Sequence, residues 1–242
     1  MTNKKQRIDV LLVDRGLVDT RAKAQAMLMA GQVMVAGKPI FKAGSLVSSD
    51  IEITLLEPPR FVGRGGLKLD YAIKQFKLDV TGKVAADIGS STGGFTDCLL
   101  KHGVIKVYAV DVGYGQLDYR LRKDSRVIVM EGVNARYSLS FPEKIDLVTM
   151  DLSFISVTKV IPTVVKELKE NGYLIVLVKP QFEAKRNEVG KGGVIKDEVI
   201  HARVLGRFVY WAVNNGFRIG GLVASPIVGS SGNREFLILL NI

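Results

Sequence analysis

Residues 84–97, with the sequence VAADIGSSTGGFTD, restrict the possible folds of this chain more than any other stretch. The apolar run Val84–Ile88 predicts a buried strand, which breaks at Gly89 and is followed by a helix that begins at Gly94 or Phe95. In open sheets of alternating strands and helices, ligands bind outside the carboxyl ends of the strands, where the next helix offers free N–H groups. The stretch therefore predicts an α/β sheet with a nucleotide-sized ligand at this turn.

The spacing of the glycines in this loop narrows the class of ligand. A dinucleotide fingerprint requires G-x-G-x-x-G, but Ser91 stands two places after Gly89, so the glycine that lets a pyrophosphate approach is missing. A phosphate-binding P-loop is excluded, because the chain contains no G-x-x-x-x-G-K-[ST] motif. The loop suits an uncharged nucleoside joined to an amino acid, with an ordinary glycine-rich turn as the structural alternative. The predicted ligand contacts in this stretch are Asp87, Gly89, Ser90, Ser91, Gly93, Gly94 and Phe95.

The pattern after residue 84 is that of a doubly wound sheet, because apolar strand segments alternate with helical ones. A helix is predicted around 156–168, and a longer one runs from its cap Asp197 to Asn215. The loop SPIVGSSGNR between the last two strands is short, which predicts an antiparallel hairpin at the end of a mostly parallel, Rossmann-like α/β sheet. Its seven predicted strands are 84–88, 107–110, 127–130, 147–150, 173–178, 217–224 and 235–241.

The first 58 residues predict a separate, smaller α+β domain of two helices and two short strands. Residues 59–66 are predicted to be a linker, because proline stiffens its start and three glycines loosen its end. An amphipathic helix over 67–76 then opens a large domain, residues 67–242. The elements predicted in the small domain are helices 8–15 and 21–30, the second capped by Asp19 or Thr20, and strands 33–35 and 51–55.

Charge and cysteine content bear on partners and compartment. The 242 residues carry a net charge of +10, which favours nucleic acid or an anionic membrane surface as a partner. Cys98 is the single cysteine, so no disulfide framework is expected, and a reducing, cytoplasmic location is predicted. The longest clean apolar run, 173–178, is far too short to span a bilayer. Two histidines and one cysteine offer no metal-ligand spacing, so no metal is expected.

The segment LLVDRGLVDTRAKAQAMLMAGQVMVAGKPI, with the later SSDIEI, resembles the small RNA-binding module of ribosomal protein S4, some pseudouridine synthases and tyrosyl-tRNA synthetases. The resemblance implies that the second helix and the adjoining β loop face RNA phosphates. A solvated basic surface on a small structural domain is the alternative. The linker and the loop 183–196 add further basic residues. The residues predicted to bind RNA are Arg7, Arg21, Lys23, Lys38, Arg60, Arg64, Lys185 and Arg186.

Asp111 is a candidate ribose ligand. It ends the second predicted strand, 22 residues after Gly89. At this point of nucleotide-binding sheets a carboxylate can accept both ribose hydroxyls of a bound adenosine. The alternative is that Asp111 only caps a turn before Gly113.

Four more charged residues are expected at the same edge of the sheet. Asp151 and Lys179 follow strands, and Glu235 opens the last one. Each is costly beside an apolar strand without a partner. With Lys68 they form a Lys-Asp-Lys-Glu set, which converges on one pocket if the crossovers are right-handed.

Motifs along the whole chain are similar to those of the TlyA family, also labelled hemolysin A, in which the RNA-binding module precedes an FtsJ-like methyltransferase domain. They are DIGSSTGGF, GGLKL, DLSFIS, VKPQFE and GNREF. The resemblance implies a class I methyltransferase that uses S-adenosylmethionine to methylate the 2′-hydroxyl of ribosomal RNA, with cytidine as the target. It also implies that Asn134 touches the adenine, which an Asx turn explains nearly as well.

The four charged residues then acquire expected catalytic roles. A neutral ribose hydroxyl is a poor nucleophile, whereas a sulfonium methyl is already activated and needs only in-line approach. Lys179 is expected to stabilise the developing alkoxide or to take its proton, and Lys68 to orient the hydroxyl. Asp151 is expected to hold the lysine ammonium beside the methionine moiety and to contact the cofactor, and Glu235 to hold the second lysine.

Two other functions are weighed against methyl transfer. A membrane-active hemolysin is disfavoured because no transmembrane run occurs, and a non-catalytic ribosome-assembly factor is disfavoured because the charged set is intact. The expected partners are ribosomal RNA or ribosomal subunits, without membrane or metal, for a monomer or weak homo-oligomer. The sequence does not determine which nucleotide is modified or which subunit carries it.

Overall fold

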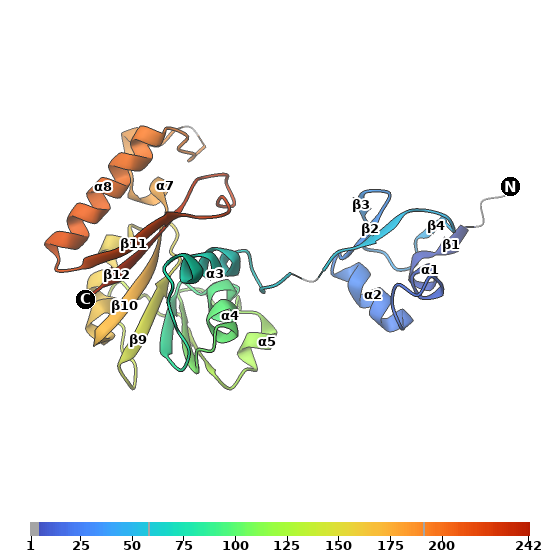
Figure 1. Cartoon of the computed structure of the whole chain (residues 1–242), viewed down its shortest axis with the longest axis horizontal. Coiled ribbons are helices and arrows are strands. Elements are labelled where there is room, and N and C mark those ends of the chain that lie inside the picture. Colours follow the sequence, from blue (N-terminus) through green and yellow to red (C-terminus); the bar gives the residue numbers. More distant parts are fainter. Residues whose placement is uncertain (1–4, 58, 191) are drawn as a thin grey trace. The chain divides into compact units, whose positions relative to one another are not determined.

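The computed structural model describes residues 5–57, 59–190 and 192–242, which form two compact units, Met1–Pro59 and Arg60–Ile242 (Figure 1). The predicted end of the small domain, Pro58, lies outside the described residues. Each unit has a hydrophobic core of its own. Among the described residues, no helix combines the length and the apolar character needed to cross a membrane.

The smaller unit packs two helices and short antiparallel strands around one core. Both predicted helices are present, as α1 (Ile8–Asp14) and α2 (Arg21–Met29). Thr20 caps α2, because its hydroxyl oxygen accepts the Lys23 N–H at 3.2 Å. The strands are β1 (Lys5–Arg7) paired with β4 (Leu46–Ser48), and β2 (Val33–Val35) between β3 (Lys38–Pro39) and β5 (Ile53–Leu55).

The larger unit is built on a seven-stranded sheet with the order β11-β12-β10-β9-β6-β7-β8. The last strand in the chain, β12, runs antiparallel to both neighbours, and the remaining pairs are parallel. The predicted α/β fold and its terminal hairpin are therefore confirmed. The strands are β6 (Val84–Ile88), β7 (Lys106–Asp111), β8 (Val127–Glu131), β9 (Ile145–Met150), β10 (Leu168–Val178), β11 (Arg218–Ala224) and β12 (Phe236–Asn241).

Helices cover both faces of this sheet (Figure 1). Successive side chains of a strand point to opposite faces, so Ala86 joins the core beneath α8 (Glu198–Asn214) and Ala85 joins the other core. That second core lies beneath α3 (Gly65–Gln75) and α4 (Gly94–Lys101). Burial on both faces explains why the central strands are continuous apolar runs.

The helix predicted over 156–168 is not continuous. The structure has α6 (Ile161–Val164) between 3-10 turns at Val157–Lys159 and Val165–Glu167, and Leu168 already begins β10. A run of β-branched residues disfavours a long helix here, because their side chains lose rotamer freedom against the preceding turn. Elements that the sequence did not predict are α5 (Tyr119–Arg122), α7 (Pro180–Glu183) and a 3-10 turn at Arg186–Glu188 in the larger unit, and β1, β3 and β4 in the smaller one.

Much of the predicted linker belongs to the larger unit. Phe61 is buried, and the Val62 N–H donates to the Asp97 carboxylate at 2.9 Å. Helix α3 begins at Gly65, two residues earlier than predicted. A Cβ on Gly66 would overlap the Phe61 ring, so glycine is required for Phe61 to pack on this helix. The glycines near the linker therefore serve close packing rather than flexibility.

We expect Gly66→Ala to destabilise the larger unit by about 1–3 kcal/mol, because the added methyl group displaces a buried aromatic ring. The shift is measured as the midpoint of urea unfolding. Trp211 is the single tryptophan and lies in this unit, so its fluorescence reports on it.

Gly206→Ala is the matched control. Gly206 lies inside α8 with open space around its Cβ position, so alanine there is expected to stabilise by about 0.5–1 kcal/mol. Equal midpoints for Gly66→Ala and the wild-type protein would show that Phe61 is not held by this contact.

Candidate active site

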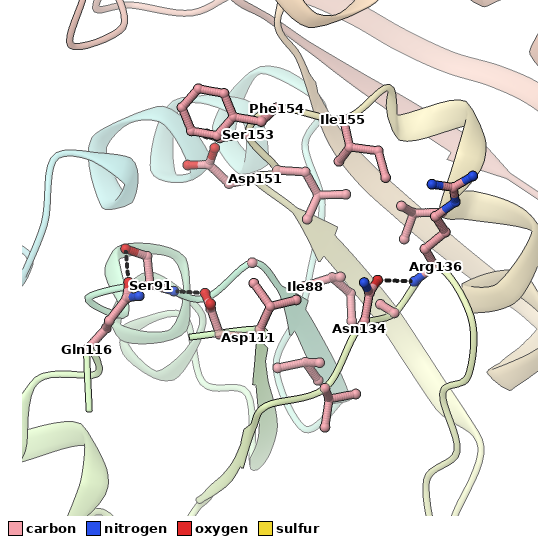
Figure 2. Close-up of a pocket in the computed structure, with 17 residues that line it drawn as sticks. Ile88, Ser91, Asp111, Gln116, Asn134, Arg136, Asp151, Ser153, Phe154 and Ile155 are labelled. Atoms are coloured by element: carbon pink, nitrogen blue, oxygen red, sulfur yellow. Dashed lines mark hydrogen bonds between the residues drawn. The ribbon is translucent and has the colours of Figure 1, made fainter. Parts of the chain in front are cut away.

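A cavity of about 450 Å³ lies at the carboxyl ends of β6, β7, β8 and β9 (Figure 2). Gly89 and Ser91 border it from the turn after β6, and Asp111 borders it from the end of β7. Asn134 follows β8, and Asp151 follows β9. The structure therefore brings five of the predicted cofactor residues to one cavity, at the edge where parallel sheets bind ligands.

The turn after β6 depends on two glycines for its shape. Gly89 has a φ of 82°, and a Cβ there would lie 2.7 Å from the Asp151 carbonyl oxygen. Gly93 has a φ of 94°, and a Cβ there would overlap the side chain of Leu121. Glycine is the residue that accepts both the left-handed conformation and such close approach. The turn can therefore pack directly against the chain that follows β9.

Asp87 was predicted to contact the ligand, but the structure places it below the cavity. It is fully buried and its carboxylate accepts the hydroxyls of Thr96 (2.7 Å) and Thr149 (3.0 Å). Asp87 belongs to β6, Thr96 to α4 and Thr149 to β9, so the carboxylate ties three elements together. Burial raises the pKa of Asp87 to about 7. These contacts hold the turn, and Asp87 does not line this cavity, so its contact with a ligand stays a prediction.

Asp111 orders the backbone around the cavity. One carboxylate oxygen accepts the Ser91 N–H at 2.7 Å, and the other accepts the Gly113 N–H at 2.8 Å (Figure 2). The turn cap that the sequence offered as the alternative is therefore present. Each carboxylate oxygen can accept more than one hydrogen bond, so both remain available to a diol. Asn134 likewise makes an Asx turn, accepting the Arg136 N–H at 3.1 Å, and still borders the cavity.

A second, polar cavity of about 180 Å³ adjoins the first, and both are bordered by Asp151 and Ser153. Ser90, Gly94 and Phe95 also line it, whereas Gly93 lines neither cavity. Lys179 closes this cavity on one side. The two cavities differ in chemistry, because the first is lined mainly by apolar residues and the second brings together a carboxylate, an ammonium and hydroxyls.

The four charged residues of the predicted catalytic set form two ion pairs. Lys179 Nζ lies 2.6 Å from Asp151 Oδ1, and Lys68 Nζ donates to Glu235 Oε2 at 2.5 Å. Lys68, Lys179 and Glu235 are each less than one-tenth exposed. Charges buried to this degree require partners, and each lysine here has its own carboxylate.

A third cavity of about 370 Å³ contains both Lys179 and Glu235 in its lining and thus connects the two ion pairs. Its walls come mainly from the segment after β10 and from the loop between β11 and β12, and Ser153 and Phe154 of the segment after β9 complete them. Asn233 fastens the first two of these segments, because its side chain accepts the Ile195 N–H and donates to the Gly193 carbonyl, both at 2.9 Å. These hydrogen bonds fix the walls of the third cavity beside the ion pairs.

Aromatic and carboxylate contacts join the chain after β9 to the chain after β10. Phe154 packs against Phe182 with ring centroids 5.1 Å apart and the rings tilted by 50°, and the Glu183 carboxylate accepts the Val157 N–H at 2.8 Å. Phe154 is 91% exposed and has a φ of 64°, a conformation that is costly for a residue other than glycine. Such strain persists where the surrounding structure over-determines it, often at functional sites.

Sequence reasoning did not assign roles to several residues that line these cavities. Ser153 and Phe154 lie in DLSFIS, Phe182 lies in VKPQFE, and Asn233 lies in GNREF. Their positions inside the family motifs were the signal in the sequence that could have identified them. Their spacing along the chain is irregular, because they come from loops rather than from periodic elements.

In the smaller unit, two predicted RNA-binding arginines share a buried carboxylate. Asp9 is fully buried, and it accepts hydrogen bonds from Arg7 (3.0 Å), Arg21 (3.1 Å) and Gln25 (3.0 Å). The Arg7 guanidinium holds the pKa of the Asp9 carboxyl well below its usual range. Both arginine side chains are about half exposed, so their remaining N–H groups face solvent.

The other predicted RNA-binding residues differ in their surroundings. Lys38 is exposed, and Lys23 pairs with Asp19 at 3.0 Å. In the larger unit, Arg60 pairs with Asp70 at 2.9 Å and Arg64 donates to the Val228 carbonyl at 2.9 Å, so both have structural contacts. Lys185 and Arg186 are exposed.

One group of described residues has the composition of a metal site, namely Asp70, Cys98 and His102. The Asp70 carboxylate already carries Arg60 at 2.9 Å and Lys74 at 2.7 Å. Two cations on one carboxylate oppose the binding of a metal cation. Burial also raises the pKa of the Cys98 thiol, which disfavours the thiolate that a metal requires.

Comparison with known proteins identifies both units. Residues 61–242 match the FtsJ-like methyltransferase family, and residues 6–53 match the S4 domain. YqxC of Bacillus subtilis, provisionally named an rRNA methyltransferase, is 46% identical over 100% of this chain and 87% of its own length. TlyA of Mycobacterium tuberculosis, named a 16S/23S rRNA (cytidine-2′-O)-methyltransferase, is 41% identical over 98% of this chain and 90% of its own.

Among solved structures, a Streptococcus thermophilus protein with a provisional hemolysin label superposes with a TM-score of 0.75. It is 42% identical, and the match covers 99% of this chain and 89% of that one.

The buried carboxyl of Asp87 makes the stability of the larger unit depend on pH. The folded carboxyl keeps its proton up to about pH 7, whereas an aspartate in the unfolded chain ionises at about pH 3.9. The contribution of Asp87 to stability is therefore fully present below about pH 4 and is lost as the pH rises through about 7.

We expect Asp87→Asn to remove the loss of stability with rising pH that is due to Asp87, because an amide does not ionise. The free energy of unfolding of the variant, minus that of wild type, should therefore be larger at pH 8 than at pH 4.5. Each unit of the removed pKa shift corresponds to about 1.4 kcal/mol of this change. Urea unfolding midpoints of both proteins at the two pH values measure the change. Parallel pH dependences would contradict the proposed buried, neutral carboxyl.

Proposed function

The chain belongs to the FtsJ-like methyltransferase family, and on this basis we propose that it transfers a methyl group from S-adenosylmethionine to the 2′-hydroxyl of a cytidine in ribosomal RNA. The observation that carries the proposal is the Lys179–Asp151 ion pair, which lies between the polar second cavity and the third cavity. The printed activity of the Mycobacterium tuberculosis relative supports the substrate and the target atom.

The first two cavities fit the two halves of S-adenosylmethionine. Apolar residues such as Val112 and Val133 in the first cavity suit an adenine ring, and Asp111 suits a ribose diol. The second cavity offers Asp151 and backbone groups of the glycine turn to a charged amino-acid end. When bound, the cofactor would supply a methyl group on positive sulfur: the ribose oxygen would bond to the methyl carbon, the C–S electron pair would stay on the neutral sulfur, and the hydroxyl proton would pass to solvent water.

The residues of the chain supply position and charge for this transfer. Lys179 borders both the second and the third cavity, so its ammonium can lie beside a ribose oxygen that enters from the third cavity. A fixed positive charge there stabilises the negative charge that develops on that oxygen. Glu235 lines the third cavity and pairs with Lys68, which lines none of the three cavities, so in this proposal Lys68 orients the same hydroxyl through Glu235.

The S4 domain supplies RNA affinity in this proposal. Arg7 and Arg21 are held by Asp9 with donors free toward solvent, and Lys38 is exposed on the β2–β3 hairpin. Preset guanidinium groups bind phosphate with less loss of side-chain freedom than mobile lysines do. A cytoplasmic location follows from the proposed substrate.

The direct test measures transfer of tritiated methyl groups from S-adenosylmethionine to 30S and 50S subunits from a strain that lacks the gene. Mapping of ribose methylation in the product then identifies the nucleotide and its subunit. No transfer to either subunit would refute the proposal and would favour a non-catalytic RNA-binding role. Dye release from liposomes, by wild type and by Lys179→Ala alike, would instead reveal the membrane activity that the hemolysin label suggests.

Lys179→Ala is expected to lower methyl transfer by at least about 100-fold, because it removes the charge beside the acceptor oxygen. Thermal unfolding should show a folded protein. Lys159→Ala, at an exposed lysine outside the three cavities, should retain wild-type turnover. Near wild-type turnover by Lys179→Ala would show that the catalytic assignment is wrong.

The double variant Arg21→Gln/Lys38→Gln is expected to weaken binding to ribosomal RNA and to flatten its salt dependence by about 0.7–0.9 in log–log slope per lost phosphate contact. Arg7 still neutralises Asp9 in this variant, so the small unit should stay folded. Affinity for S-adenosylmethionine should not change. Lys159→Gln/Lys166→Gln, at two exposed lysines of the larger unit, controls for the loss of two positive charges, and equal weakening in both double variants would contradict an RNA-facing S4 surface.

A further inference from the structure

The three cavities described above meet at one side chain. Among the described residues, Ser153 alone lines all three of them. Lys179 lines the second and third, and Phe154 lines the first and third. Ser153 therefore lies where the cofactor side and the acceptor side of the site adjoin. Figure 2 shows Ser153 above the cavity, between Asp151 and Phe154.

Ser153 also accepts the hydrogen bond that sets the direction of the Lys179 ammonium. Lys179 Nζ donates to Ser153 Oγ at 2.9 Å. The contact with Asp151 Oδ1 is shorter, at 2.6 Å, but Oδ1 has no hydrogen-bond partner among the described residues, so that contact is an ion pair with side-on geometry. Asp151 is therefore the nearer partner of the Lys179 ammonium, whereas the hydrogen bond to Ser153 sets the direction of its N–H bonds.

The geometry of an ammonium makes this direction important. Its three N–H bonds are held at fixed angles to one another, so fixing one fixes the other two. Asp151 supplies a balancing charge, which depends mainly on distance, whereas a hydrogen bond to a developing charge depends on angle. Because Ser153 accepts one N–H bond of the Lys179 ammonium, the other two N–H bonds point in fixed directions where the second and third cavities adjoin.

We propose that Ser153 is a positioning residue for methyl transfer, whose hydroxyl orients the Lys179 ammonium toward the ribose oxygen at the point where the three cavities meet. The proposal rests on the methyltransferase function proposed above. Ser153 acts through Lys179, so its loss should slow the chemical step without weakening the binding of either substrate. Its side chain is exposed to the cavities, so a small replacement should not disturb the core.

The test compares Ser153→Ala with Ser153→Thr, which keeps a hydroxyl. Transfer of tritiated methyl groups to ribosomal subunits gives kcat and both KM values, and calorimetry gives the affinity for S-adenosylmethionine. Ser125→Ala is the matched control, because Ser125 is exposed in the same unit and lines none of the three cavities. All variants are made in the full chain.

We expect Ser153→Ala to lower kcat by about tenfold or more, to leave both KM values and the cofactor affinity within about twofold, and to be rescued in large part by Ser153→Thr. An unchanged kcat in Ser153→Ala would overturn the proposal, as would equal loss in both variants, since the hydroxyl would then be irrelevant. Loss of cofactor affinity would also overturn it, because the role would then be binding. A wild-type protein without methyl transfer would refute the proposed function itself, a result distinct from these.

Discussion

The close contact between the turn after β6 and the backbone of Asp151 is the constraint on which the rest of the site depends. Gly89 approaches the Asp151 carbonyl so closely that no Cβ fits, and the Ile88 carbonyl accepts the Asp151 N–H at 3.1 Å. Strands β6 and β9 are parallel neighbours, so their carboxyl ends emerge together and place Asp151 beside the glycine turn. Because β10 is the next strand, Lys179 at its end reaches Asp151.

Paired charge is the second feature that organises the molecule. Lys68 and Glu235 meet across 167 positions of sequence, and Lys179 meets Asp151 at the neighbouring cavity. A buried charge without a partner is strongly unfavourable, so the members of each pair depend on one another. In the smaller unit, Asp9 similarly accepts both Arg7 and Arg21. Carboxylates thus hold cations in place at the cavities of the larger unit and on the smaller unit.

Much of the fold was predictable from local pattern, because apolar strands that are buried on both faces produce unbroken runs such as 173–178. The helix over 156–168 was predicted wrongly, since apolar periodicity gives no warning that a β-branched run breaks into short turns. Asp87 was predicted at the ligand because it lies near the end of a strand, but the direction of its side chain depends on residues of neighbouring elements. Thr96 and Thr149, from other elements, hold it below the turn.

The sequence by itself determined the α/β class and the family to which the motifs belong, because these follow from residue types at local spacings. The catalytic role of the Lys-Asp-Lys-Glu set stays a prediction from the sequence. Tertiary structure alone decided which carboxylate pairs with which lysine, which residues line each cavity, and that Ser153 stands where the cavities meet. The physical reason is that pairing and lining are long-range properties. They arise when loops from separate strands are brought to one edge of the sheet, and no local pattern encodes the direction in which a loop side chain points.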